Sequence, residues 1–166
     1  MSDLLIRLTK RAPSDYVLTC VRADGSTTTQ RTHGESAKSF PFHDLTHFAV
    51  ETVLGHRQGF YGLVCDGWQL ADFTQPGTSA RLPDAAVANE ALVGLFDGER
   101  ASGTQWTAAG FNDSLAQYLK TAGRAPAAPL SENDLARVRA EHARLAALWH
   151  ALPVGGTLEL AYARNP

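Results

Sequence analysis

Charge is scarce in this 166-residue chain. Charged residues make up only 19% of it, and Lys and Arg do not cluster anywhere along the sequence. The formal net charge is −2 at pH 7, so no broad positive face is available to hold a phosphate backbone. We therefore expect no nucleic-acid partner.

Long hydrophobic runs are also missing. No apolar stretch is long enough to cross a bilayer, and the opening residues MSDLLIRLTKR lack the apolar segment of a signal peptide. The sequence therefore predicts a cytoplasmic protein with no membrane partner.

Cysteine is limited to two residues, Cys20 and Cys65, which do not form a CxxC pair. In a reducing compartment both are expected to be small buried hydrophobes. The sequence alone does not exclude a disulfide between them.

Strand-forming residues dominate the beginning of the chain. Leu4–Lys10 and Tyr16–Arg22 are rich in β-branched and apolar residues. Asp24-Gly25 then precedes a Thr-rich stretch, and this dipeptide favours a two-residue hairpin because both residues tolerate positive φ. We predict an antiparallel β-meander over residues 1–33, with its polar third strand at an edge.

Helical periodicity dominates residues 41–152, and the alternating pattern of residues 157–164 predicts a C-terminal strand that returns to the sheet. The expected helices are residues 43–54, 56–68 (with a strand as the alternative), 85–96, 112–123 and 131–152, and residues 72–84 are expected to form a loop. The prediction is a single α+β domain, residues 1–166, in which four to five helices pack with the sheet.

The helix predicted from His43 carries the concentrated chemistry. At about 100° per residue, four ionisable side chains fall on one narrow stripe, and apolar residues occupy most of the remaining circumference. These four are His43, Asp44, His47 and Glu51. They are metal-ligand and acid/base types, whereas a solvated stripe usually carries long charged side chains. We predict a largely buried helix with a polar site.

Spacing along this helix favours some ligand pairs over others. His47 lies one turn from both His43 and Glu51, so it can share an ion with either neighbour. His43 and Glu51 are separated by about 12 Å of helical rise and are not expected to share one ion. A metal site would therefore centre on His47, with either His43 or Glu51 as a second ligand and a third ligand from another part of the chain. Asp44 would then be the catalytic base or a residue that orients a ligand.

A purely structural explanation competes with the metal site. The helix dipole favours Asp44 near the N-terminus, Glu51 is explained as a solvated residue, and both histidines can hydrogen-bond to the backbone. An HxxxH pair alone is a weak motif, so both interpretations stay open.

His142 is the candidate ligand from another helix. It falls inside the apolar stripe of the helix over residues 131–152. Most histidines in that position are core residues with a hydrogen-bonding partner. If the two helices face one another, His142 becomes the natural third ligand. The remaining histidines and serines are explained by capping, dipole or loop positions: His33, His56, His150, Ser36 and Ser39.

The segment FHDLTHFAVETVLGHRQGFYGLV supports a resemblance to known proteins. Its HDLxHxxVE and GFxG elements resemble a set of small uncharacterised bacterial proteins with a hairpin-rich N-terminus and a C-terminal strand. HDLTH is similar in part to the zincin HExxH motif, with Asp44 where that motif has its catalytic Glu. The His43-Asp44 pair is similar to that of HD-type phosphohydrolases, which are all-helical. The chain is assigned to neither of these two families.

Three functional hypotheses follow. The first is a divalent-metal site for Zn, Ni, Mn or Fe, built on His43 and His47 with Glu51 or His142, and serving a metal-dependent hydrolase. The second is a non-catalytic domain that binds a protein partner or forms a homo-oligomer through an exposed patch of the aromatic residues Phe40, Phe42, Trp68 and Phe73. The third is a metal-free small-molecule pocket with the polar stripe as its wall.

Overall fold

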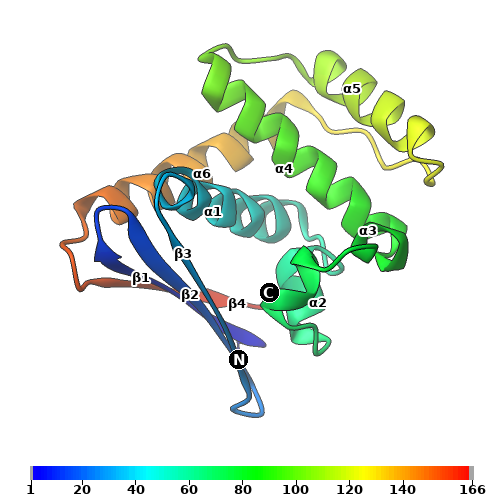
Figure 1. Cartoon of the computed structure of the whole chain (residues 1–166). Coiled ribbons are helices and arrows are strands. Elements are labelled where there is room, and N and C mark those ends of the chain that lie inside the picture. Colours follow the sequence, from blue (N-terminus) through cyan, green and yellow to red (C-terminus); the bar gives the residue numbers. More distant parts are fainter. Residues whose placement is uncertain (1, 165–166) are drawn as a thin grey trace.

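A four-stranded antiparallel sheet forms one side of the molecule in the computed structural model, which describes residues 2–164 (Figure 1). Its strands are β1 (Leu4–Ala12), β2 (Asp15–Arg22), β3 (Thr27–His33) and β4 (Thr157–Tyr162). The strand order is β3-β2-β1-β4. The predicted meander and the returning C-terminal strand are therefore confirmed, and the Thr-rich third strand lies at an edge.

Alternation along the strands places one face of the sheet in the core. Leu4, Ile6 and Leu8 of β1 are fully buried, and the intervening residues are partly exposed. Ile6 pairs with Cys20 on one side and with Leu160 on the other, so the apolar face continues across three strands. The hydrophobic face is therefore fixed by period-two patterning.

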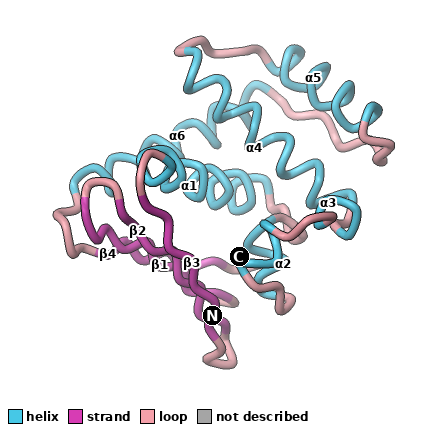
Figure 2. Tube along the Cα trace, viewed as in Figure 1, coloured by secondary structure: helices cyan, strands magenta, loops and turns pink. Residues whose placement is uncertain are grey.

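Helices cover that face in layers (Figure 2). The helical elements are α1 (Ser36–Leu54), α2 (Phe60–Cys65), the 3-10 turn η1 (Leu70–Thr74), α3 (Thr78–Arg81), α4 (Asp84–Ser102), α5 (Ala108–Thr121) and α6 (Glu132–Ala151). Helix α1 contacts both α6 and α4, and α5 packs on α4 farther from the sheet (Figure 1). Among residues 2–164 no helix has the length and apolar content needed to span a membrane.

Several helix boundaries differ from those predicted. Helix α1 begins at Ser36 and runs through Pro41, because a proline near the helix start removes one hydrogen bond without ending the helix. Helix α4 continues to Ser102 and ends at Gly103, which has a φ of 68°. The expected loop 72–84 contains turns of η1 and α3 that are too short to produce a periodic pattern. The ambiguous segment is helical over Phe60–Cys65.

Two predicted helix ends are confirmed. Gly55 closes α1 in the left-handed conformation with a φ of 70°. Ser131 and Asp134 form a reciprocal capping box at the start of α6, with the Ser131 amide 2.9 Å from Asp134 Oδ2 and the Asp134 amide 3.1 Å from Ser131 Oγ. These contacts satisfy amides that would otherwise lack partners.

An ion pair joins α4 to α6. Arg139 donates to both carboxylate oxygens of Glu99 at 2.8 and 2.7 Å, and the amide of Trp106 donates to the same carboxylate at 2.9 Å. The Glu99 side chain is only 7% exposed. Burial opposes its ionisation, yet the hydrogen bonds from Arg139 and Trp106 hold the pKa of Glu99 below its ordinary value.

Replacing Glu99 with Gln should lower the free energy of unfolding by about 1.5–3 kcal/mol near neutral pH, because charge-assisted hydrogen bonds are lost. Since the folded-state pKa is lowered, this contribution is present above the ordinary glutamate pKa and is lost as pH falls through the folded value. Urea unfolding of both proteins at several pH values would measure it. A difference that grows on acidification would contradict this account.

Candidate functional site

Helix α1 carries its polar stripe into the interior. Asp44, His47 and Glu51 are each no more than 5% exposed, whereas the His43 side chain is 36% exposed. The predicted burial of this helix is confirmed. The stripe therefore forms a polar seam inside the fold with one end open to solvent.

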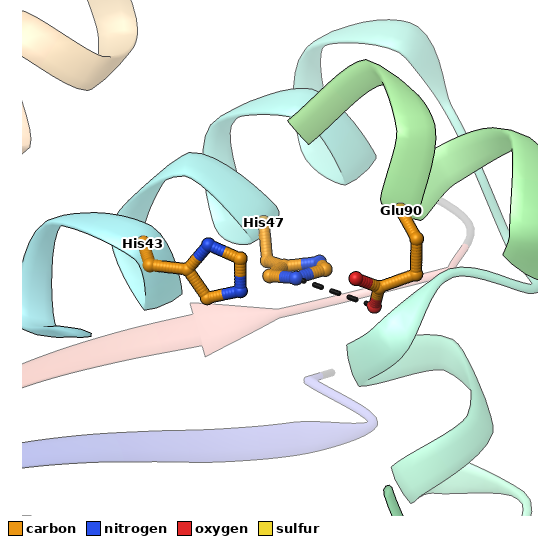
Figure 3. Close-up of side chains that lie close together, drawn as sticks. All are labelled: His43, His47 and Glu90. Atoms are coloured by element: carbon orange, nitrogen blue, oxygen red, sulfur yellow. Dashed lines mark ion pairs between the residues drawn. The ribbon is translucent and has the colours of Figure 1, made fainter. Parts of the chain in front are cut away.

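His43 and His47 meet a third side chain, Glu90, which comes from α4 (Figure 3). Each residue offers one ligand atom, and these three atoms all lie within 4.8 Å of one another. His47 Nε2 lies 3.4 Å from Glu90 Oε1, and the two imidazole rings are 4.8 Å apart between centroids. This grouping is called the triad below.

A carboxylate lies close to Nδ1 of each imidazole, the ring nitrogen that is farther from Glu90. His43 Nδ1 is 2.6 Å from Asp97 Oδ2, and His47 Nδ1 is 3.5 Å from Glu51 Oε1. Asp97 at Nδ1 favours the His43 tautomer with a proton on that nitrogen, so the Nε2 lone pair of His43 is left free. His47 Nδ1 also lies 3.4 Å from Asn89 Nδ2. In Figure 3 a nitrogen of each ring faces the Glu90 carboxylate. A carboxylate therefore orients the His43 ring, and Glu51 and Asn89 lie behind the His47 ring.

Asp97 is itself held in place. Arg100 Nη2 donates to its Oδ1 at 2.6 Å, and Thr46 Oγ1 lies 2.9 Å from the same oxygen. The other oxygen is left for His43. Burial raises the pKa of Asp97, but His43 and Arg100 together bring it below its ordinary value. The partner of His43 is thus a fixed, ionised carboxylate.

Without an added proton or a metal ion, the triad carries the negative charge of Glu90. Burial alone would lower the pKa of His47, but Glu90 and Glu51 raise it to about 10. His47 therefore carries a proton between two carboxylates at neutral pH. A divalent cation in that position would satisfy the same negative charges and displace the proton.

A pocket of about 460 Å³ opens beside the triad. All three members line it, together with Asp44 and apolar side chains that include Phe60 and Phe73. Tyr16 donates to Asp44 Oδ2 at 2.7 Å, and the other Asp44 oxygen has no hydrogen-bond partner among the described residues. Burial raises the pKa of Asp44 to about 6, although Tyr16 opposes the shift. Asp44 thus presents a carboxyl group to the same space as the triad.

Glu51, which was predicted as a possible metal ligand, hydrogen-bonds to the backbone at the start of α2. Its carboxylate accepts from the amides of Tyr61 and Gly62 at 3.0 and 3.2 Å, and the Tyr162 hydroxyl lies 3.3 Å from it. A Cβ at position 59 would lie 2.4 Å from Glu51 Cδ, so Gly59 provides the space. Glu51 therefore anchors the start of α2 and reaches the triad only through His47.

His142 lies away from the triad. Its Nε2 is 3.2 Å from the carbonyl oxygen of Phe42, and its side chain lines a different cavity. The face of α6 that carries it does turn toward α1, which was the condition for ligation, but it meets the side of α1 on which Thr46 lies. The structure thus groups His43 and His47 with Glu90, places Glu51 at the other nitrogen of His47, and leaves His142 away from the triad.

Glu90 and Asp97 were not identified as site residues from the sequence. Both lie on α4, and their spacing of seven residues puts them on one helix face, which was the available signal. Nothing local indicates that this face meets α1. Among the weaker candidates, His56 Nδ1 lies 3.0 Å from Asn89 Oδ1, which gives it a structural partner.

Replacing Glu51 with Gln should lower the free energy of unfolding by about 1.5–3 kcal/mol, because the buried carboxylate loses charge-assisted bonds to the α2 amides. Chemical denaturation would measure it. Glu35→Gln is the matched control, since the Glu35 side chain is 89% exposed. Equal stability of the two variants would contradict the anchoring role.

Comparisons with known proteins give no relative for this chain. No family model, curated protein or solved structure matches it.

Proposed function

We propose that this protein binds one divalent metal ion through His43, His47 and Glu90. The observation that carries the proposal is the convergence of three ligand atoms within 4.8 Å, with Asp97 behind His43 and Glu51 behind His47. Carboxylates that orient ligating histidines in this way are a recurrent feature of metal sites. A purely structural ion-pair cluster does not require both imidazoles to be oriented toward a common point.

The donor set suggests which ions fit. Two imidazoles and one carboxylate match the three protein ligands of catalytic zinc sites and the facial arrangement of non-haem iron sites. Nitrogen and oxygen donors of this kind suit Zn, Ni, Mn or Fe. Three protein ligands leave coordination positions for water or substrate, and the pocket beside the triad gives access to them.

The reaction class that suits this arrangement is metal-assisted hydrolysis. A bound ion lowers the pKa of a coordinated water, and a nearby carboxyl group can accept or return its proton. Asp44 lines the same pocket with one oxygen free of protein partners, so we assign it that role. The pocket carries no Lys or Arg, which disfavours phosphorylated substrates.

The competing proposal is a non-catalytic domain that binds a partner or self-associates. Of the four aromatic residues considered for an exposed patch, only Phe40 is largely exposed, at 44%. Phe42 and Phe73 pack against the core, and the Trp68 ring lies 5.4 Å from that of Phe73. This distribution favours the metal site over an aromatic docking patch.

Metal titration of untagged protein, stripped with a chelator, should give one ion per chain for at least one of Zn, Ni, Mn and Fe. His47→Ala and Glu90→Gln should each weaken binding at least about tenfold, because one ligand is removed. Isothermal titration calorimetry would measure both quantities. His33→Ala, on the exposed edge strand, is the control and should bind as the wild type does.

Two results would contradict the metal proposal. One is the absence of saturable binding for all four ions. The other is equal affinity in His47→Ala, Glu90→Gln and the His33→Ala control.

Asp44→Asn should retain metal affinity within about threefold and slow hydrolysis of p-nitrophenyl acetate by the zinc-loaded protein about 100-fold, since the proton acceptor is lost. The amide keeps the hydrogen bond from Tyr16, so the fold is preserved. Initial rates with and without bound zinc would test this. Equal rates for the two proteins would remove Asp44 from the mechanism.

A further inference from the structure

Aromatic side chains form part of the wall of the pocket that contains the triad. The Phe60 ring lies 4.9 Å from the His47 ring between centroids, and 4.5 Å from the Phe73 ring. Phe60 and Phe73 both line the pocket, and each is only partly buried. A series of rings therefore begins at a metal ligand and leaves aromatic surface open to the pocket.

The segment from η1 to α3 supplies most of the remaining wall, and Leu70 and Leu82 are among its apolar contributions. Hydrogen bonds hold this segment in place. The Leu70 amide donates to Thr28 Oγ1 of β3 at 2.9 Å, and the Thr78 hydroxyl donates to the carbonyl oxygen of Asp72 at 2.6 Å. The wall that faces the triad is therefore formed before a ligand enters, which reduces the cost of binding.

The uncharged polar residues of the lining lie mainly where the pocket opens. Thr74, Gln75 and Ser79 are exposed. Thr78 is buried, but its hydroxyl donates to carbonyl oxygens of its own segment. Gln30 of β3 is partly buried and adds a neutral amide. The deeper part of the pocket thus combines the triad with apolar side chains, and its uncharged polar groups bring no charge to it.

The charged groups of the lining belong to the site itself. Glu90 and Asp44 are its acidic residues, and it contains no Lys or Arg. With a divalent ion held by the triad, two positive charges face these two carboxylates. No charge is left over to pair with an ionised group of a ligand, and burial of such a group without a partner is costly. The pocket therefore suits an uncharged ligand.

We propose that the substrates of this site are uncharged esters or amides of aromatic carboxylic acids, with the aromatic ring on Phe60 and Phe73. This substrate class rests on the proposed metal-assisted hydrolysis. Because Phe60 contacts the ligand His47, a ring bonded directly to the reacting carbonyl carbon reaches Phe60. Tilted or offset ring pairs add a favourable interaction to the burial of apolar area.

The reaction of such a substrate is a simple hydrolysis. The oxygen of water adds to the carbonyl carbon, and one proton of that water passes to Asp44. The bond from the carbonyl carbon to the leaving oxygen or nitrogen then breaks, and Asp44 returns the proton to the leaving atom. The products are the aromatic acid and an alcohol or amine.

Benzohydroxamic acid is the probe, since its two oxygens chelate a metal ion and its ring is bonded directly to the carbonyl carbon. Three comparison ligands each change one feature. Acetohydroxamic acid lacks the ring, cyclohexanecarbohydroxamic acid has a saturated ring, and 4-carboxybenzohydroxamic acid adds a charge. Calorimetric titration of the zinc-loaded protein should give the tightest binding for the probe. The expected losses are at least about tenfold without the ring, about threefold with the saturated ring and at least about tenfold with the charge.

Two variants assign the aromatic preference to residues. Phe60→Leu/Phe73→Leu should bind the probe and its saturated analogue equally, because aliphatic side chains replace the aromatic surface. Phe73→Leu alone should lower that preference and serves if the double variant does not fold. Both should keep the zinc affinity of the wild type, since neither ring is a ligand. Tyr118→Leu is the control, because Tyr118 is 51% exposed on α5 and absent from the lining.

The outcomes separate this substrate class from the metal site. Failure of the wild type to bind zinc or any of the other three ions overturns the proposed function, and the substrate class with it. Zinc binding without tighter binding of benzohydroxamic acid than of acetohydroxamic acid overturns the substrate class alone. Equal or tighter binding of the 4-carboxy ligand overturns the preference for uncharged substrates. A folded, zinc-binding variant that keeps the full aromatic preference overturns the role of Phe60 and Phe73.

Discussion

The enclosure of His47 between two carboxylates is the interaction on which the rest of the site depends. Its side chain is 2% exposed, with Glu51 at Nδ1 and Glu90 at Nε2. Two carboxylates beside a buried, uncharged imidazole would be costly, although the Glu90 side chain is 38% exposed, so the arrangement favours a positive charge at its centre. A proton meets that demand in the metal-free protein, and a divalent cation meets it better because His43 adds a third donor.

This demand links several elements of the fold. Glu51 ties α1 to the amides of α2, and Glu90 and Asp97 tie α1 to α4. The Tyr162 hydroxyl of the C-terminal strand donates to the Glu51 carboxylate. The site is thus built at a junction of elements, where each ligand is restrained by a neighbour that has its own hydrogen bonds.

Sequence patterns predicted the fold well because they are local. Period-two alternation located the strands, and Gly55 and the Ser131–Asp134 capping box located helix ends through backbone requirements that do not depend on tertiary contacts. The start of α1 was missed because Pro41 normally favours a helix end, whereas here it lies early in a helix that the core stabilises.

The site was only half predictable for the same reason. His43 and His47 share a helix face, so their proximity follows from spacing. Glu90 and Asp97 reach them only through the packing of α4 on α1, and no local pattern in the sequence encodes that contact. The apolar stripe that carries His142 follows from spacing, but the side of α1 that it meets depends on how the two helices cross.

X-ray absorption spectroscopy at the metal edge of the loaded protein tests the central claim most directly. For bound zinc, the account predicts only nitrogen and oxygen neighbours at about 2.0–2.2 Å, with the outer-shell scattering of two imidazole rings. Sulfur neighbours, or a spectrum without imidazole scattering, would contradict it.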